Sequence, residues 1–134
     1  MSGTTVDWAL RAAYLFNIAT LTPVLWTLYR HRGAGPLVAF NGTVANVDGL
    51  RLLIASVWLA VLLGSVAGLA APRAFVALLV FQVAYKAAYL LGYVVPVWRR
   101  DGRRAVPWAM ALVFALIVAA WPPVIAAAWG RTPA

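Results

Sequence analysis

The chain has 134 residues, of which 65% are hydrophobic and only 10% are charged, and its formal net charge is +8 at pH 7. A soluble domain carries about 25% charged residues, so this composition excludes an ordinary water-soluble globule and an intrinsically disordered chain. The sequence has no cysteine and one histidine, which excludes disulfides, iron–sulfur clusters and bis-histidine haem, and we expect neither a metal nor a cofactor.

The first predicted element is a transmembrane helix over residues 8–29. A bilayer core of roughly 30 Å needs about 20 apolar residues in helical conformation, and this stretch is long enough. Trp8 and Tyr29 bracket it, as aromatic residues do at the two interfaces of a membrane. The residues before it carry no positive charge, so we interpret it as a retained helix rather than a signal peptide.

The longest connection covers residues 31–49. Its Asn41-Gly42 pair lies between β-prone apolar residues and predicts a small hairpin or a short amphipathic piece at the membrane surface; a plain interfacial tether is the simpler alternative. We expect Asp48 to cap the next helix and Arg51 to extend toward the lipid headgroups. A second interpretation joins the polar residues of this region in a site at the membrane rim, formed by Asn41, Asn46, Asp48 and Arg51.

The second span is predicted over residues 52–71 and the third over residues 74–98. The connection between them is so short that we expect a tight antiparallel pair of helices. Small residues recur every four positions along the second span, and such a stripe allows close helix packing in lipid. We expect the stripe to pack within one bundle; association with a second copy or with a partner membrane protein is the alternative. Its members are Ser56, Ala60, Gly64 and Gly68.

The fourth span is predicted over residues 107–129, with Pro107 at its start. None of the four stretches alternates in hydropathy as a transmembrane strand does, and a helix satisfies its own backbone hydrogen bonds in lipid. The predicted fold is therefore all-α: a compact antiparallel four-helix transmembrane bundle, forming a single domain over residues 1–134.

Arginine is distributed unevenly between the two ends of the predicted helices. The positive-inside rule places the loops 30–51 and 99–104 in the cytoplasm and both termini outside, in the plasma (inner) membrane. Basic residues at helix ends attract anionic lipid headgroups, so membrane lipids are the expected partners and nucleic acid is not. The arginines of the cytoplasmic side are Arg30, Arg32, Arg51, Arg99, Arg100, Arg103 and Arg104, against Arg11, Arg73 and Arg131.

Lys86 lies near the middle of the third span, where a charged side chain costs about 2.5–3.5 kcal/mol on insertion scales. No acid lies within any span, so this lysine has no carboxylate partner at its depth. The remaining partners are neighbouring polar side chains, an interface that the side chain reaches by snorkelling, or an external anion or lipid headgroup. By helical spacing, the candidate ligand-binding residues are Lys86, Gln82, Tyr85, Tyr89, Asn17 and Tyr14.

Three classes of function fit these residues. The leading hypothesis is a small integral membrane protein that binds a lipophilic or anionic ligand, or acts as an accessory subunit, with a polar site around Lys86. The second is a cofactor-free membrane enzyme, isomerase-like or cyclase-like, in which Lys86 and a tyrosine act as acid and base on a lipophilic substrate. The third is a small transporter of anions or other solutes, although the absence of glutamate argues against a proton-coupled exporter.

Overall fold

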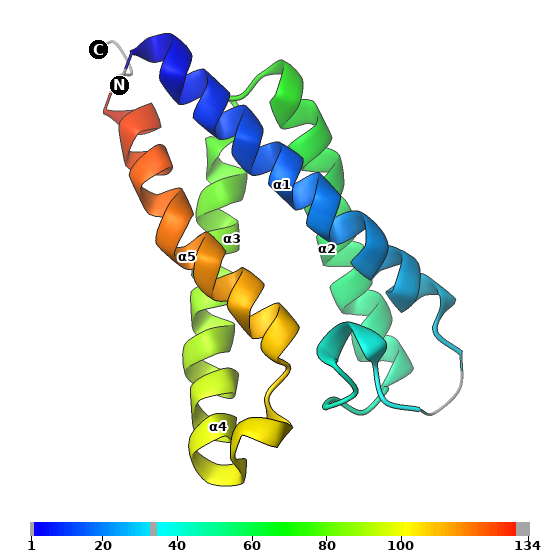
Figure 1. The fold of residues 1–134 in the computed structure, drawn as a ribbon. Coiled ribbons are helices and arrows are strands. Elements are labelled where there is room, and N and C mark those ends of the chain that lie inside the picture. The colour runs from blue at the N-terminus through cyan, green and yellow to red at the C-terminus, as the bar shows by residue number, and fades with distance from the viewer. Residues whose placement is uncertain (1, 33–34, 131–134) are drawn as a thin grey trace.

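The structure, a computed structural model, describes residues 2–32 and 35–130 and contains helices but no strand in these residues. The predicted all-α fold is therefore confirmed. Two short 3₁₀ turns lie in the connections, η1 (Val38–Phe40) and η3 (Arg103–Ala105). The long helical segments are α1 (Gly3–Arg30), α2 (Asp48–Ala70), α3 (Val76–Tyr89) with its continuation through the π-helical turn η2 (Leu90–Val94) into α4 (Val95–Asp101), and α5 (Trp108–Trp129) (Figure 1).

Three of these segments are long and apolar enough to cross a membrane: Asp48–Ala70, Val76–Asp101 and Trp108–Trp129. The predicted second, third and fourth spans are thus helices of membrane-spanning length and composition. α1 is longer, at 28 residues, but its asparagine and threonines make it the most polar of the four.

α1 and α2 begin earlier than the apolar stretches that predicted them, whereas α3 and α5 begin one or two residues later. α1 begins at Gly3, where the Ser2 hydroxyl accepts a hydrogen bond from the Thr5 backbone N–H at 3.2 Å. α2 begins at Asp48, so the long connection ends at Val47, and the prediction that Asp48 is the N-cap is wrong. A hydropathy pattern predicts only the apolar part of a helix. The helix itself can continue through a polar turn whose backbone groups are hydrogen-bonded, so hydropathy misplaces its ends.

Of the alternatives predicted for the segment around Asn41-Gly42, the hairpin is wrong, although both residues adopt the left-handed conformation, with φ of 54° and 69°. One backbone hydrogen bond, from the Leu37 N–H to the Val44 carbonyl at 2.9 Å, closes the turn without a strand ladder. The side chains of Leu37 and Phe40 are buried between the helices. The backbone forms the 3₁₀ turn η1 here in place of paired strands, and the segment fills the end of the bundle as a plug.

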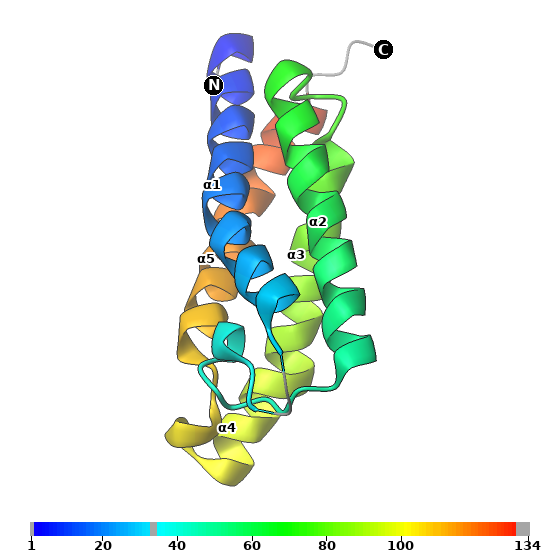
Figure 2. The same cartoon turned by 90° about the vertical axis from the view of Figure 1, so that its right-hand side faces the viewer.

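The bundle consists of two helix pairs, α1 with α2 and α3 with α5 (Figures 1 and 2). α2 and α3 are joined by a short turn and run antiparallel, as predicted, but they make far fewer contacts with each other than the helices of the two pairs do, so the prediction that they pack tightly is wrong. α1 and α5 lie close together where α1 begins and α5 ends, and they diverge toward the other end of the bundle (Figure 1). The divergence divides the interior into two halves with different packing.

We call these the closed half and the open half. In the closed half, α1 and α5 are in contact through a buried cluster formed by Val6, Leu10, Ala13, Tyr14, Val76, Leu79, Ile117, Trp121, Ile125 and Ala128. In the open half, the 37–44 segment and several aromatic side chains occupy the wider space, and the buried cluster there is formed by Leu21, Leu25, Leu28, Leu37, Phe40, Ala55, Trp58, Val61, Met110 and Phe114.

Two glycines of the predicted small-residue stripe explain the close packing in the closed half. A Cβ atom on Gly68 would lie 2.7 Å from the ring of Tyr14 in α1, and one on Gly64 would lie 2.9 Å from Leu78 in α3. Packing of these residues within one bundle is therefore confirmed. Ser56 and Ala60 are exposed, so the stripe contacts the bundle along only part of its length.

A π-helical turn interrupts the helix between α3 and α4 and ends two residues before Pro96. Pro96 has no backbone N–H, and its ring would collide with the carbonyl of Gly92 in a regular α-helix. The π turn widens the backbone at this point and lets the helix continue to Asp101. It also brings the rings of Tyr89 and Tyr93 to a centroid distance of 5.1 Å.

Candidate functional site

Lys86 lies on the buried face of α3, where its side chain is only 2% exposed. Its Nζ donates hydrogen bonds of 2.7 Å to Gln82 Oε1, one helical turn earlier, and of 2.7 Å to the hydroxyl of Tyr85. It also lies 4.4 Å from the centroid of the Tyr85 ring and 5.2 Å from that of Phe114. Aromatic faces and two neutral oxygens thus replace water around this amine.

All three acids of the sequence are paired elsewhere. Asp7 pairs with Arg73, Asp48 with Arg51 and Asp101 with Arg100, each at 2.8 Å. Lys86 therefore has no side-chain carboxylate partner in the part of the chain that the structure describes, as the sequence predicted. A protonated Lys86 would need its counter-charge from outside the protein.

Lys86 faces a cavity of about 230 Å³ between all four helices of the bundle. Asn17, Gln82 and Lys86 are buried at its inner end, Thr20 lies nearer the mouth, and the other lining residues are apolar. The lining residues are Asn17, Thr20, Leu21, Val24, Ala39, Trp58, Gln82, Lys86, Ala109, Met110, Val113, Phe114 and Ile117. A mostly apolar cavity with a few convergent polar groups is the usual form of a small-molecule site.

The cavity opens where α1 and α5 diverge. Its inner residues are buried, whereas Thr20 and Val24 on α1 and Val113 on α5 are half-buried, and Ala109 at the start of α5 is exposed. Figure 1 shows the two helices separating on this side of the bundle. The mouth thus lies on the side of the bundle, between two helices, rather than at its end.

The amide of Gln82 leaves a free donor in the site. Its Oε1 accepts from Lys86, which fixes the orientation of the amide, and its Nε2 is buried and has no hydrogen-bond partner in residues 2–32 and 35–130. A buried donor without a partner costs about 1–3 kcal/mol, so it is an unusual group to leave unsatisfied in an interior.

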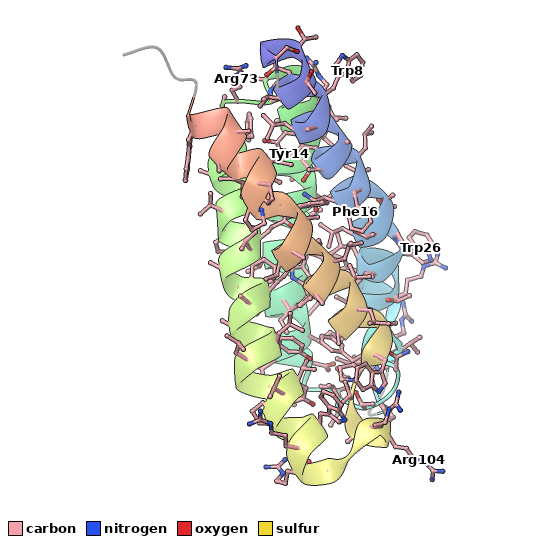
Figure 3. All side chains as sticks on the ribbon, turned by 60° about the vertical axis from the view of Figure 1, so that its left-hand side comes forward. Trp8, Tyr14, Phe16, Trp26, Arg73 and Arg104 are labelled. Atoms are coloured by element: carbon pink, nitrogen blue, oxygen red, sulfur yellow. The ribbon has the colours of Figure 1, made fainter. Side chains whose placement is uncertain are left out.

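Two predicted residues of α1 occupy different places. Asn17 lines the cavity, and its Nδ2 donates to the Ser65 hydroxyl at 3.2 Å, which in turn donates to the Val61 carbonyl at 2.8 Å. Tyr14 does not line the cavity: its hydroxyl donates to the Pro72 carbonyl at 2.7 Å, and its ring packs on Gly68. Figure 3 shows Tyr14 in the closed half of the bundle. Tyr14 therefore ties α1 to the α2–α3 turn.

Tyr85 and Tyr89 line a second cavity of about 340 Å³ between α2 and α3. Tyr85 connects the two cavities, because its hydroxyl accepts from Lys86 while its ring lies at the wall of the second cavity. The hydroxyl of Tyr89 is buried and has no hydrogen-bond partner in the described residues. Trp58, Met110 and Phe114 line both cavities and separate them.

The predicted rim residues do not form one site. Asn46, Asp48 and Arg51 are bonded to one another, whereas Asn41 caps a different helix. Arg51 is 7% exposed and does not snorkel: it donates to the Leu28 carbonyl, to Asn46 Oδ1 at 3.0 Å and to Asp48 Oδ1 at 2.8 Å. This guanidinium fastens the start of α2 to the end of α1 through hydrogen bonds from all three of its nitrogens. Asn41 lies apart, where its Oδ1 accepts from the Ala109 N–H at 3.2 Å and caps α5.

Sequence reasoning missed the apolar walls of the cavity. Trp58 belongs to α2, and Met110 and Phe114 belong to α5; none of them carries a local signal that distinguishes it from other core residues. Only the observation that Trp58 shares a helical face with Arg51, Ala55 and Ser65 could have indicated its inward orientation.

The chain matches no protein-family model, no curated protein and no solved structure. The cavity and the side chains around it are therefore the features from which a function can be inferred.

Proposed function

We propose that this chain is an integral membrane protein in which α1 crosses the bilayer together with the three more apolar helices. With 28 residues, α1 measures about 42 Å, which exceeds a hydrocarbon core of roughly 30 Å. Exposed tryptophans lie near both ends of the bundle: Trp8 and Trp129 at one end, Trp26 and Trp98 toward the other. The guanidinium of Arg30 stacks on Trp26 at 4.0 Å, an arrangement suited to the headgroup region.

We propose further that the η1 and η3 connections face the cytoplasm and that the outer ends of α1 and α5 face the opposite side of the plasma (inner) membrane. Arg104 lies at one end of the bundle and Arg73 at the other (Figure 3), and arginines are more numerous at the Arg104 end. Because the chain contains no cysteine, single Thr4→Cys and Arg104→Cys variants can be labelled in intact cells with a membrane-impermeant maleimide. Thr4→Cys should react and Arg104→Cys should not; the reverse pattern would overturn the orientation.

The function that the geometry supports best is the binding of a lipophilic ligand in the cavity beside Lys86. The observation that carries this proposal is one buried amine, without a carboxylate, at the inner end of an apolar cavity with a lateral mouth. A lysine in the hydrocarbon region lowers the stability of the bundle, so its position is most simply explained by a ligand that it contacts.

Filling the mouth of the cavity tests this proposal. Val113→Trp places a bulky ring at the mouth, whereas Leu112→Trp adds the same ring at an adjacent exposed position on α5 and serves as the matched control. Small molecules that copurify with each variant are extracted and identified by mass spectrometry. We expect a lipophilic molecule in the wild type and in Leu112→Trp but not in Val113→Trp. Equal recovery from all three proteins, or from none, would refute ligand binding in this cavity.

A second candidate is a cofactor-free isomerase or cyclase. It is favoured by the 2.7 Å hydrogen bond between Lys86 Nζ and the Tyr85 hydroxyl, because an amine and a phenol in contact can exchange a proton with a substrate. If Tyr85→Phe retains the copurifying ligand but changes its chemical identity, the protein is an enzyme. An unchanged ligand favours a binding protein.

A further inference from the structure

We propose that the ligand of this cavity is a long-chain carboxylic acid, whose carboxylate binds Lys86 Nζ and Gln82 Nε2 and whose chain extends along the apolar wall to the mouth between α1 and α5. This inference rests on the proposed ligand-binding function and specifies the chemical class of the ligand.

The hydrogen-bonding groups at the inner end require a ligand that accepts hydrogen bonds. Lys86 uses two of its three N–H donors, on Gln82 Oε1 and on the Tyr85 hydroxyl. Gln82 Oε1 is thereby occupied, and the buried Nε2 of the same amide remains without a partner. One ammonium donor and one amide group are therefore available side by side, and a ligand oxygen that accepts from both would satisfy them.

The positive charge of a protonated Lys86 favours a carboxylate over a neutral carbonyl as the ligand group. Every acidic side chain of the chain is paired with an arginine, so none can neutralise Lys86. A carboxylate supplies the missing negative charge and can accept from two donors at once, and hydrogen bonds between charged groups are about twice as strong as neutral ones.

The remaining cavity wall suits a hydrocarbon chain. Leu21, Val24 and Val113 lead from the polar inner end toward the mouth, without another charged group along the way. Since the mouth lies between two helices that we place in the bilayer, the chain of the ligand reaches the lipid phase directly. An acid drawn from the membrane could enter without crossing water.

Direct binding of a fluorescent fatty acid tests the inference. The probe is cis-parinaric acid, and its methyl ester serves as the uncharged control, each titrated into purified protein in neutral detergent. We expect the acid to bind at least about tenfold more tightly than the ester. Lys86→Met should weaken binding of the acid about tenfold and leave the ester unchanged, and Gln82→Met, which removes only the amide donor, should weaken the acid by a smaller factor. Arg104→Met, which removes an exposed cation, should change neither.

Different results of these titrations would contradict the carboxylate inference alone or ligand binding as a whole. If acid and ester bind equally and Val113→Trp weakens both, the cavity binds a ligand but its head is not a carboxylate, and only the inference fails. If the acid binds Lys86→Met as well as the wild type, while the variant keeps the elution volume and thermal midpoint of a folded protein, the acid sits elsewhere and the inference also fails. If Val113→Trp affects neither probe, and nothing copurifies in a Val113-dependent manner, both proposals fail.

Discussion

The closed and open halves of this bundle contain the same four helices, yet their interiors differ because of the sizes of the side chains at the helix contacts. In the closed half, Gly68 lets the ring of Tyr14 lie directly on the backbone of α2, and α1 reaches α5. In the open half, Trp58 and Phe114 meet edge to face at a centroid distance of 6.4 Å and hold the helices apart. The comparison shows how one bundle can combine a tightly packed core with a cavity.

Polar groups follow the same division. In the closed half, the hydroxyl of Tyr14 is bonded, and Arg11 donates to the Leu69 carbonyl at 3.1 Å. In the open half, the Gln82 amide and the Tyr89 hydroxyl each leave a buried group without a partner in the described residues. Trp121 Nε1 is the exception in the closed half. Two of these three buried polar atoms without a partner in the described residues thus lie in the open half, beside or near the cavities.

The largest loss of stability is expected from a bulky side chain at Gly68, where α1 and α2 pack closely in the closed half. Gly68→Leu would force its side chain into the ring of Tyr14, which is fully buried and held by its hydroxyl, so we expect a loss of about 3 kcal/mol or more in unfolding free energy. Gly92→Ala is the matched control, because a Cβ there meets no atom within 4 Å. Denaturation in mixed micelles measures both. A Gly68→Leu protein as stable as the control would show that the two helices do not approach closely here.

The next largest loss of stability is expected from removing Arg51, which joins the start of α2 to the end of α1 in the open half. Arg51→Met removes the bonds to the Leu28 carbonyl, Asn46 and Asp48, and we expect a loss of about 2 kcal/mol. Arg104→Met, which removes an exposed arginine, should leave stability unchanged within error. Equal stability of the two variants would mean that Arg51 extends to the headgroups, as the sequence suggested.

Removing the buried amine of the open half should raise the unfolding free energy, whereas the two preceding substitutions should lower it. If the bundle spans a bilayer as proposed, Lys86→Met removes a cost of about 2.5–3.5 kcal/mol, while the two lost hydrogen bonds offset about 1 kcal/mol each, so we expect a net gain of about 1 kcal/mol. Thermal unfolding of the ligand-free protein is the measurement. A clear loss of stability would mean that Lys86 organises the bundle rather than a ligand site.

The smallest effect is expected from a single hydrogen bond of the closed half. Tyr14→Phe keeps the ring on Gly68 and removes only the bond to the Pro72 carbonyl, and we expect a loss of about 1 kcal/mol. Ligand binding should be unchanged, since Tyr14 does not line the cavity. Weaker ligand binding in this variant would restore Tyr14 as a site residue.

The sequence was sufficient to predict the features that depend on local patterns. Long apolar runs predicted the helices, and a period of 3.6 residues placed Gln82, Tyr85 and Lys86 on one face. The cavity, by contrast, depends on how far α1 and α5 diverge, which no local pattern records. The same holds for Tyr14, whose hydroxyl donates to the Pro72 carbonyl instead of lining the cavity, and for Phe40, whose side chain is buried in a short 3₁₀ turn where a hairpin was predicted.

The central claim is that a single amine lies in the interior of the open half, away from water. Lys86 is the only lysine of the sequence, so lysine-selective ¹⁵N and ¹³C labelling gives one side-chain signal for the protein in lipid nanodiscs. A Lys86→Met, Arg104→Lys double variant supplies the signal of a surface lysine for comparison. We predict that a water-soluble gadolinium chelate broadens the surface signal and leaves that of Lys86 unaffected. Equal broadening of the two signals would contradict the account.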